Sequence, residues 1–510
     1  MFRAIRLLPL LIGLSLLAAC GKGGGLASAP QLQSGRGQLI TNPPTKLGSF
    51  SVSDLLSKLT GNDVGQELLK LAFSPTCSVD VYQLQYDTVG AQSESTTASG
   101  ALMIPSGLDS RCQSPRPILL YAHGTSTLKT YNIADVTNNG EGLLLAAVFA
   151  SRGYIVVAPN YAGYDTSSLA YHPYLDADQQ SKDMIDALTA ARSAFASTST
   201  SDNQKLFITG YSQGGYVAMA THRALQAAGT TVTGSAPMSG PYALAAFVDA
   251  VFEGQVSGGA VVNFTLLATS YQHAYANIYS SPTDVFEAKY ASGIDSLLPS
   301  TTAVSTLVSQ GRLPDNAIFS STPPAPEFAA MTPATMPASL APAFALGFGS
   351  DNLVTNNYRL SYLRDAQANP DGGFPGTSTG LPAASPGTTL RQALKTNDLR
   401  NWSPTSPVLL CAGNEDPTVF FLNTQLMQGY WVNNAPSSVV TVLDVDSSAS
   451  SGDPYADLKT GFAAAKALVA AGAVAGGATD GGASAVLHAY HARLVPPFCL
   501  EAVREFFDNH

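Results

Sequence analysis

The fold of this chain is decided by the stretch Lys205-Leu-Phe-Ile-Thr-Gly-Tyr-Ser212-Gln-Gly-Gly-Tyr-Val-Ala-Met219. A short apolar run ends at Gly-Tyr-Ser-Gln-Gly, and a helix-compatible segment follows at once. This is the strand–turn–helix arrangement that holds a serine on a sharp turn, with its hydroxyl exposed above a parallel sheet. Glycines at 210 and 214 fit such a turn because a side chain at either position would collide across it. The sequence therefore predicts that Ser212 is a nucleophile.

The same five-residue pattern occurs a second time, in Gly376-Thr-Ser378-Thr-Gly380. This copy lies in a segment rich in Gly, Pro and Ser, with no strand pattern before it and no helix pattern after it. The structural context that gives the pattern its meaning is missing, so we interpret Ser378 as a loop serine.

The first residues have the layout of an export signal. Two arginines precede an apolar run from Leu7 to Leu17. The run ends in Leu-Ala-Ala-Cys20, which resembles the lipobox of bacterial lipoproteins. That resemblance implies a signal peptide over residues 1–19 and lipidation of Cys20. Gly21 stands where an aspartate would retain a lipoprotein in the inner membrane, which favours the outer membrane. The alternative is a plain secretory signal in which the cysteine has no role.

Composition indicates a folded, acidic protein. Apolar residues make up 45% and charged residues 12%, with a formal net charge of −10. An acidic chain without a basic run is a poor nucleic-acid binder. Residues 20–48, rich in Gly, Ser, Pro and Gln, predict a flexible tether. No later segment has eighteen uninterrupted apolar residues. The closest, 461–478, contains glycines and Lys466 and is expected to form a helix and loop of the folded part. We therefore expect a chain anchored to a membrane by its lipid and not spanning it.

Buried strands and helices alternate along most of the chain. Such alternation predicts an α/β protein with a mostly parallel central sheet, helices on both faces and an antiparallel opening pair. Strands are expected near residues 79–89, 95–104, 117–122, 154–159, 206–209, 234–238, 408–412 and 439–445, and helices near 141–151, 176–195, 216–228 and 497–507. The alternation fails over residues 239–402, which is too long for a connection within a compact domain. We predict a large cap, inserted over the carboxyl edge of the sheet between core parts 49–238 and 403–510.

A serine hydroxyl needs a base to accept its proton and a carboxylate to orient that base. The strand 407–412 runs into Gly-Asn-Glu-Asp416-Pro-Thr-Val, where a carboxylate follows a buried strand directly. Asp416 is therefore the expected acid. Glu415 is a weaker competitor, and its alternative interpretation is an exposed loop charge. Asp444 and Asp446 follow the next strand and are expected to be solvated.

The base is sought among seven histidines. Only His488 and His491 lie after the last strand and before the final helix. We favour His491, which is nearer the proline-started helix that would hold the loop. The oxyanion formed on attack needs backbone donors. These are expected to be the amides of Gln213 and Thr125, while His123 is expected to brace the loop and not to act as the base.

Four cysteines remain besides Cys20: Cys77, Cys112, Cys411 and Cys499. An even number in an exported protein favours disulfides. Three pairings are possible, and we prefer Cys77–Cys112 with Cys411–Cys499 because each joins segments expected to be close. The alternative is four buried free thiols. A metal site is disfavoured because no Cys-x-x-Cys or His-x-x-x-His spacing occurs.

Three motifs carry a family resemblance: Gly-Tyr-Ser212-Gln-Gly, Ala-Gly-Asn-Glu-Asp416-Pro-Thr-Val and Tyr-His491-x-x-x-Val-Pro-Pro-Phe-Cys-Leu. They resemble the α/β-hydrolase superfamily, and more narrowly its secretory lipase and bacterial lipoprotein esterase branch, over about residues 75–238 and 403–507. The resemblance implies ester hydrolysis through an acyl-serine intermediate, without cofactor or metal. Two departures are His-Gly-Thr-Ser in place of His-Gly-Gly-Gly and Ala492 in place of a glycine.

The expected function is therefore that of a lipid-anchored serine hydrolase of the bacterial cell envelope, periplasmic or surface-facing, acting on a small-molecule or lipid ester. Two rivals remain. One is a serine exopeptidase of the same fold, which a carboxylate pair near the site would favour; Glu327 and Asp351 in the cap are the candidates. The other is a non-catalytic envelope lipoprotein that uses the scaffold for binding.

Overall fold

A computed structural model describes residues 35–61, 63–70, 75–435 and 439–510. The predicted signal peptide and the predicted lipidation site, Cys20, lie outside the described residues.

The core is a nine-stranded sheet in the order β1-β2-β3-β5-β4-β6-β7-β10-β11. The strands are β1 Thr45–Phe50, β2 Ser78–Val89, β3 Ser95–Ser106, β4 Arg116–Ala122, β5 Ile155–Pro159, β6 Asp202–Tyr211, β7 Gly234–Met238, β10 Val408–Ala412 and β11 Val440–Asp444. The neighbours from β5 to β11 run parallel, whereas β1, β2 and β3 are antiparallel to their partners. The predicted mostly parallel sheet with an antiparallel opening pair is confirmed.

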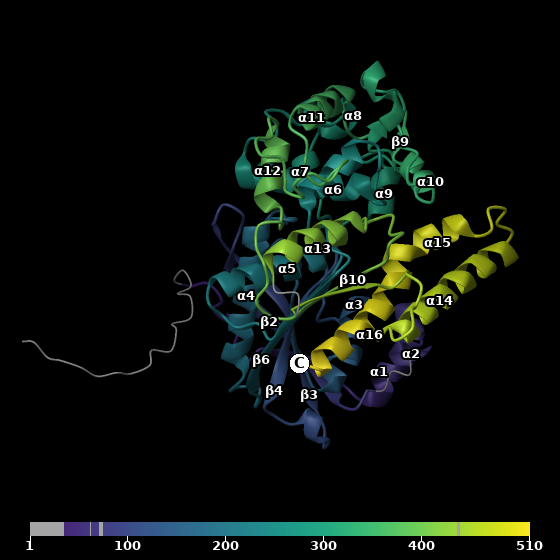
Figure 1. The fold of residues 1–510 in the computed structure, drawn as a ribbon. Coiled ribbons are helices and arrows are strands. Elements are labelled where there is room, and N and C mark those ends of the chain that lie inside the picture. Colours follow the sequence, from purple (N-terminus) through teal and green to yellow (C-terminus); the bar gives the residue numbers. More distant parts are fainter. Residues whose placement is uncertain (1–34, 62, 71–74, 436–438) are drawn as a thin grey trace, which may run out of the picture.

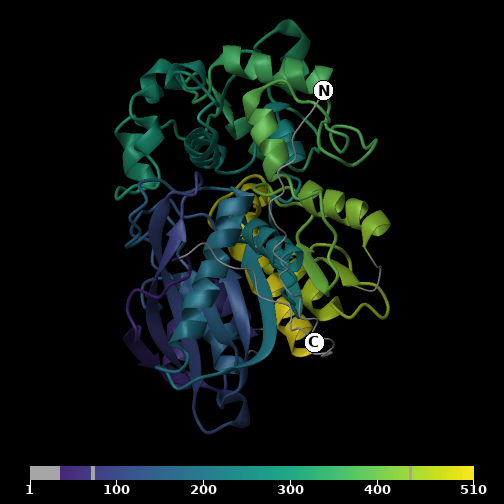
Figure 2. The same ribbon diagram turned by 90° about the vertical axis from the view of Figure 1, so that its left-hand side faces the viewer.

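Helices cover both faces of the sheet (Figures 1 and 2). Successive strand residues point to opposite faces. Leu120 accordingly packs in one cluster with helices α4 and α5, whereas Leu119 packs in another with α1, α3 and α16. The helices on the two faces include α1 Val52–Leu59, α2 Asp63–Lys70, α3 Gly140–Val148, α4 Ala177–Ala194, α5 Gln213–Ala227 and α16 Val495–Asp508. Because both faces are buried at the centre of the sheet, β5 and β10 read as continuous apolar runs without polar alternation.

The chain between β7 and β10 forms a separate group of short helices and a two-stranded ribbon, which lies above the sheet in Figures 1 and 2. Its main elements are α6 Leu244–Phe252, α7 Ala260–Tyr275, α8 Ala288–Ala291, α9 Val304–Ser309, β8 Phe319–Ser320, α10 Ala341–Leu346, β9 Phe348–Gly349, α11 Asn356–Ala368 and α12 Thr389–Asn397. We call this group the cap segment. The residue boundaries predicted for the domains stay predictions.

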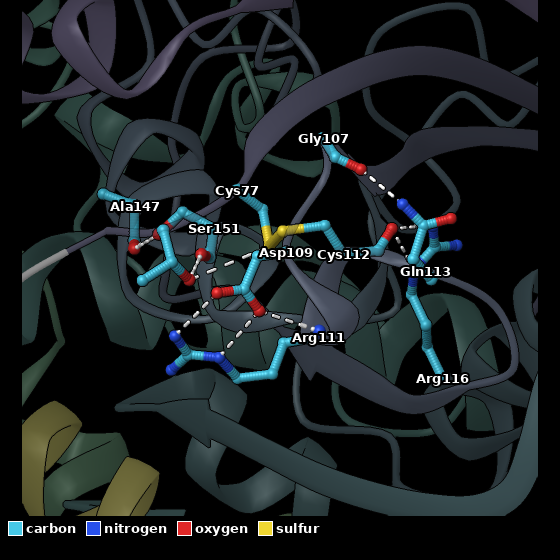
Figure 3. Close-up of a disulfide and its surroundings, with 10 residues drawn as sticks. Cys77, Gly107, Asp109, Arg111, Cys112, Gln113, Arg116, Ala147 and Ser151 are labelled. Carbon is cyan, nitrogen blue, oxygen red and sulfur yellow. Dashed lines mark hydrogen bonds and ion pairs between the residues drawn. A yellow bond between two sulfur atoms is a disulfide. The ribbon is translucent and has the colours of Figure 1, made fainter.

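Both predicted disulfides are present. Cys77, directly before β2, is bonded to Cys112, and Cys411 in β10 is bonded to Cys499 in α16. Figure 3 shows the first bond and its surroundings. The carbonyl of Cys112 accepts a hydrogen bond from Nε of Arg116 at 3.2 Å, and the amide of Cys77 donates to the carbonyl of Ser151 at 2.8 Å. Both half-cystines are thus fixed at their backbones.

The prediction of a flexible tether over residues 20–48 is wrong for residues 35–48. Arg36 forms an ion pair of 2.9 Å with the buried carboxylate of Asp186 in α4. Thr45–Phe50 forms β1 and pairs with β2. This segment packs because it supplies a charge for a buried acid and a strand for the sheet edge, two roles that polar composition does not reveal.

The last part of the chain forms a helical hairpin and the final helix. Its elements are α13 Leu422–Asn434, α14 Ala456–Ala475, α15 Ala483–Ala489, a π-helical turn Tyr490–Leu494 and α16. Among the described helices, α14 alone is long and apolar enough to cross a membrane by length and composition, with 17% of its most apolar window buried. Lys466 of α14 pairs with Glu415 at 3.1 Å, and Phe462 packs edge-on against Tyr490. These contacts attach α14 to the core beside β10.

Candidate active site

The predicted nucleophile lies on a strained turn between β6 and α5. Ser212 has φ 59° and ψ −121°, a conformation that residues with a side chain rarely adopt. A Cβ at Gly214 would lie 1.9 Å from the carbonyl oxygen of Ala122, and one at Gly210 would lie 2.3 Å from that of Gly214. The expectation that these two positions require glycine is confirmed. The tight approach of three backbone segments holds the serine in its unfavourable conformation.

The predicted acid is fully buried at the end of β10. Oδ1 of Asp416 accepts hydrogen bonds from the amides of Thr418 at 2.8 Å and Val419 at 3.0 Å. Its Oδ2 lies 2.6 Å from Nδ1 of His491. The backbone thus fixes the carboxylate, and the carboxylate fixes the imidazole. With a proton on Nδ1, Nε2 of His491 is left as the acceptor.

The predicted base lies on a helix, not on a loop. His491 belongs to the π-helical turn that joins α15 to α16, so the expected loop position is wrong. The hydroxyl of Tyr211, next to the predicted nucleophile, donates to the carbonyl of His491. Nε2 of His491 is buried and has no hydrogen-bond partner among the described residues. The side chains of His491 and Ser212 line the same cavity.

The competing histidine is placed differently. His488, one turn earlier in α15, is exposed and also lines this cavity. Its Nδ1 lies 2.7 Å from the carbonyl oxygen of Ser484, a contact within its own helix. Of the two histidines, only His491 contacts the predicted acid.

The competing carboxylates are engaged elsewhere. Lys466 lies 3.1 Å from Glu415 and 2.6 Å from Asp446. Asp444 accepts from the side-chain amide of Asn414 at 2.8 Å, and burial raises its pKa. The expectation that Asp444 and Asp446 are solvated is therefore wrong. Both help to fold the turn after β10 and leave Asp416 as the acid that faces the imidazole.

Of the two predicted oxyanion donors, Thr125 lines the serine cavity from the turn after β4, and Gln213 follows Ser212 in the chain as the first residue of α5. The turn is held by Glu141 of α3, whose Oε1 accepts from the amide of Gly124 at 3.1 Å. Glu141 also accepts from two tyrosine hydroxyls. The sequence analysis missed this carboxylate, because no local pattern connects the first turn of α3 to the loop after β4.

His123 braces the same turn, as expected. Its ring is buried and stacks between Tyr131 and Tyr161, with centroid distances of 4.3 and 4.1 Å. The ring nitrogens lie 2.6 Å from the carbonyl oxygen of Gly124 and 3.0 Å from that of Asn160. Burial lowers the pKa of His123. A fully enclosed imidazole whose two ring nitrogens both face backbone carbonyls suits a support and not a base.

His172 is a second residue that sequence reasoning missed. Its Nδ1 lies 3.0 Å from the carbonyl oxygen of Ala162, and its Nε2 lies 2.7 Å from Nε2 of Gln213. Burial lowers the pKa of His172 to about 3, so the ring is neutral. Nδ1–H then donates to Ala162, and Nε2 accepts from the Gln213 amide. His172 thus orients the residue whose backbone amide is a predicted oxyanion donor.

The cavity beside Ser212 has a volume of about 570 Å³. Its lining includes Thr125, Glu141, Val262 of the cap segment and His491. No group of three or more His, Cys, Asp or Glu side chains that could hold a metal ion occurs in the part of the chain that the structure describes.

Comparisons with known proteins support an α/β-hydrolase fold with esterase relatives. A model of the prolyl oligopeptidase family matches residues 144–238, the segment that contains the serine turn. The rice cell wall degrading esterase LipA from Xanthomonas oryzae is 26% identical over 84% of this chain and 94% of its own, with a TM-score of 0.62. A ligand-bound form of that esterase is 25% identical over 93% and 99%, with a TM-score of 0.66. A putative hydrolase from Legionella pneumophila, 18% identical over 92% and 98% with a TM-score of 0.62, shares the fold. No curated protein matches the sequence.

Proposed function

We propose that this chain, a member of the α/β-hydrolase superfamily with esterase relatives, cleaves carboxylic esters through an acyl-serine intermediate. One observation carries the proposal. Asp416 holds His491 at 2.6 Å, and the imidazole and Ser212 line the same cavity. An oriented base that shares a cavity with a strained, half-buried serine is the arrangement that activates a hydroxyl at neutral pH.

In the proposed reaction, Nε2 of His491 takes the proton of Ser212 as its Oγ attacks the ester carbonyl. The amides of Gln213 and Thr125 stabilise the oxyanion. His491 then gives its proton to the leaving alcohol and activates the water that releases the acid. Asp416 stabilises the imidazolium in both steps.

A serine peptidase is the second candidate, because the matching family model is that of prolyl oligopeptidases. The cap carboxylates considered for binding an amino terminus lie elsewhere: Glu327 is 3.8 Å from Arg364, and Asp351 is 2.9 Å from Lys289. Neither lines the serine cavity. Glu141 does, but its oxygens already accept three hydrogen bonds. The described residues thus offer the cavity no spare carboxylate, which favours esters over peptides.

We also propose that the protein is a lipoprotein of the bacterial cell envelope, anchored through Cys20. The two disulfides support an oxidising compartment. Globomycin treatment of the producing cells would leave the signal peptide attached if the proposal is right. Release of a soluble, unlipidated protein would contradict it.

Three variants test the proposed chemistry with p-nitrophenyl acetate and an aminoacyl anilide. We expect Ser212→Ala and His491→Ala to lower kcat for the ester by roughly 10⁴-fold or more. The matched control, His488→Ala, should lower kcat by less than about tenfold, because its ring does not contact the predicted acid. Equal low turnover by the wild type and Ser212→Ala would instead support a non-catalytic binding protein. Anilide hydrolysis faster than ester hydrolysis would support the peptidase.

A further inference from the structure

Ser212 lies where two cavities of unequal size meet. One has a volume of about 570 Å³, and the other about 60 Å³. Ser212, Asn263 and Thr418 line both of them. Asn263 belongs to α7, so this helix of the cap segment lies at the boundary between the two spaces.

The two cavities differ in chemistry as well as size. The smaller one is enclosed by apolar side chains of α6 and α7, namely Leu244, Phe247, Val248, Val251, Phe264 and Leu267. No acidic or basic side chain is among the described residues that line it. The larger cavity contains both His491 and the predicted donor Thr125. The general acid of the proposed reaction therefore faces only one of the two spaces.

We propose that the smaller cavity binds the acyl group and the larger cavity binds the alcohol, so that the substrates are esters of short acids with large alcohols. This inference rests on the proposed function. When the tetrahedral intermediate breaks down, the bond between the acyl carbon and the alcohol oxygen is cleaved, and that oxygen takes the proton from Nε2 of His491. The alcohol oxygen must then lie on the side of His491, which is the side of the larger cavity.

The reverse arrangement lacks the general acid, because His491 does not line the smaller cavity. With the alcohol in the smaller cavity, the departing oxygen would lie among the apolar side chains of α6 and α7. An alkoxide that leaves unprotonated into such surroundings is strongly disfavoured, because burying an unpaired charge is costly. The carbonyl carbon stays on Ser212, and the acyl tail takes the space that His491 does not line.

The smaller volume sets the length of the acid. Liquid water occupies about 30 Å³ per molecule, and a methylene group is of similar size, so a cavity of about 60 Å³ holds roughly two carbons beyond the carbonyl. The walls have little freedom to move, since Leu244 is 1% exposed and Leu267 is 4% exposed. Acetyl and propionyl groups are accommodated, whereas an octanoyl tail has to displace packed side chains.

Two isomeric esters test the assignment of the acyl group to the smaller cavity, because they differ only in which side of the carbonyl carries the long chain. Octyl acetate and ethyl octanoate have the same formula but place the long chain on opposite sides of the carbonyl. We expect kcat/KM to be at least about tenfold higher for octyl acetate, because only its acyl group fits the smaller cavity without displacing packed side chains. Equal values, or a preference for ethyl octanoate, would overturn the assignment while leaving the ester hydrolase intact. Failure to cleave either ester or p-nitrophenyl acetate would instead refute the proposed function.

Two substitutions on α7 identify the cavities. Leu267→Ala enlarges the smaller cavity and should raise the ratio of ethyl octanoate to octyl acetate hydrolysis at least about fivefold. Val262→Phe is on the same helix but faces the larger cavity. It should lower the rate of octyl acetate hydrolysis, and it thereby raises the same ratio by slowing octyl acetate instead of by speeding ethyl octanoate. The ratio is measured on one preparation, so partial misfolding leaves it unchanged. Parallel changes for both esters in both variants would contradict the assignment.

Discussion

The disulfide Cys411–Cys499 joins the two halves of the proposed proton relay. Cys411 lies in β10, five residues before Asp416, and Cys499 lies in α16, eight residues after His491. The substitution pair Cys411→Ala with Cys499→Ala removes this link. Cys77→Ala with Cys112→Ala is the matched control, because that bond is formed next to the start of β2, far along the chain from the serine turn and the acid.

The loss of stability follows from the loop that each bond closes. The sequence separations are 88 and 35 residues. In the chain-entropy model these correspond to about 4.6 and 3.8 kcal/mol at 25 °C. Unfolding entropy near 2.1 cal/mol/K per residue gives roughly 1 kcal/mol/K for a chain of this length. The expected decreases in Tm are therefore about 5 and 4 °C, too similar to tell the two bonds apart.

Activity should distinguish them. Without the Cys411–Cys499 bond, the turn after β10 is tied to the turn before α16 by the 2.6 Å contact of Asp416 with His491 and by the amide of Glu415, which donates to the hydroxyl of Tyr490 at 3.1 Å. We expect the Cys411/Cys499 variant to lose ester hydrolysis well below its own Tm, and the Cys77/Cys112 variant to keep it.

The assay combines thermal melts with initial rates measured every 5 °C up to the midpoint. If the Cys411/Cys499 variant stays fully active up to its own Tm, the bond only stabilises the fold and the reasoning about the relay is wrong. If neither variant lowers Tm, the loop-closure argument fails. Mass spectrometry of the non-reduced wild type should show both links, and four alkylatable thiols would refute them.

Two further predictions concern the serine turn and the pH dependence of stability. Gly214→Ala should abolish soluble, active protein, because the new Cβ would lie 1.9 Å from a backbone oxygen; Gly429→Ala in α13, with nothing within 4 Å, should be neutral or stabilising by up to about 1 kcal/mol in urea unfolding. Between pH 7 and pH 5 the wild type should lose about 2 kcal/mol of unfolding free energy through His172. The imidazole of the unfolded chain, with an ordinary pKa of 6.5, binds a proton over this range. The imidazole of the folded chain, with a pKa of about 3, does not. His172→Gln should lack that loss in urea unfolding at the two pH values; an identical pH dependence in both proteins would show that His172 is not kept neutral by burial.

The parts of the fold that local rules govern were predictable from the sequence. A glycine that cannot carry a Cβ, a serine before a helix and an acid directly after a buried strand each leave a mark within a few residues. Asp416 and Ser212 therefore emerged from short motifs. The choice of His491 over His488 used only its distance from the final helix, and the structure adds the contact of 2.6 Å with Asp416 that the choice lacked.

The supports of the site were not predictable, because their partners are distant in sequence and carry no pattern. His172 meets Gln213 across 41 residues, and Glu141 meets Gly124 across 17 residues. What brings them together is the parallel sheet, whose strand ends gather the following loops at one edge. A histidine or glutamate that supports a site from such a position is indistinguishable in sequence from a solvated one. The role of such a residue depends on which otherwise unpaired hydrogen-bond donor or acceptor lies next to it in the fold.

Both supporting residues, Glu141 and His172, act on the same part of the site, the predicted oxyanion donors. Glu141 fixes Gly124, whose neighbour Thr125 is one predicted donor, and His172 fixes the side chain of Gln213, the other. Donors aimed in advance stabilise charge without reorganising as it develops. Each support is held in place by its own surroundings: burial lowers the pKa of His172 to about 3 and keeps its ring neutral, and three donated hydrogen bonds fix the Glu141 carboxylate. The strain at Ser212 and the rigidity of its donors are therefore two consequences of the same packing at the carboxyl edge of the sheet.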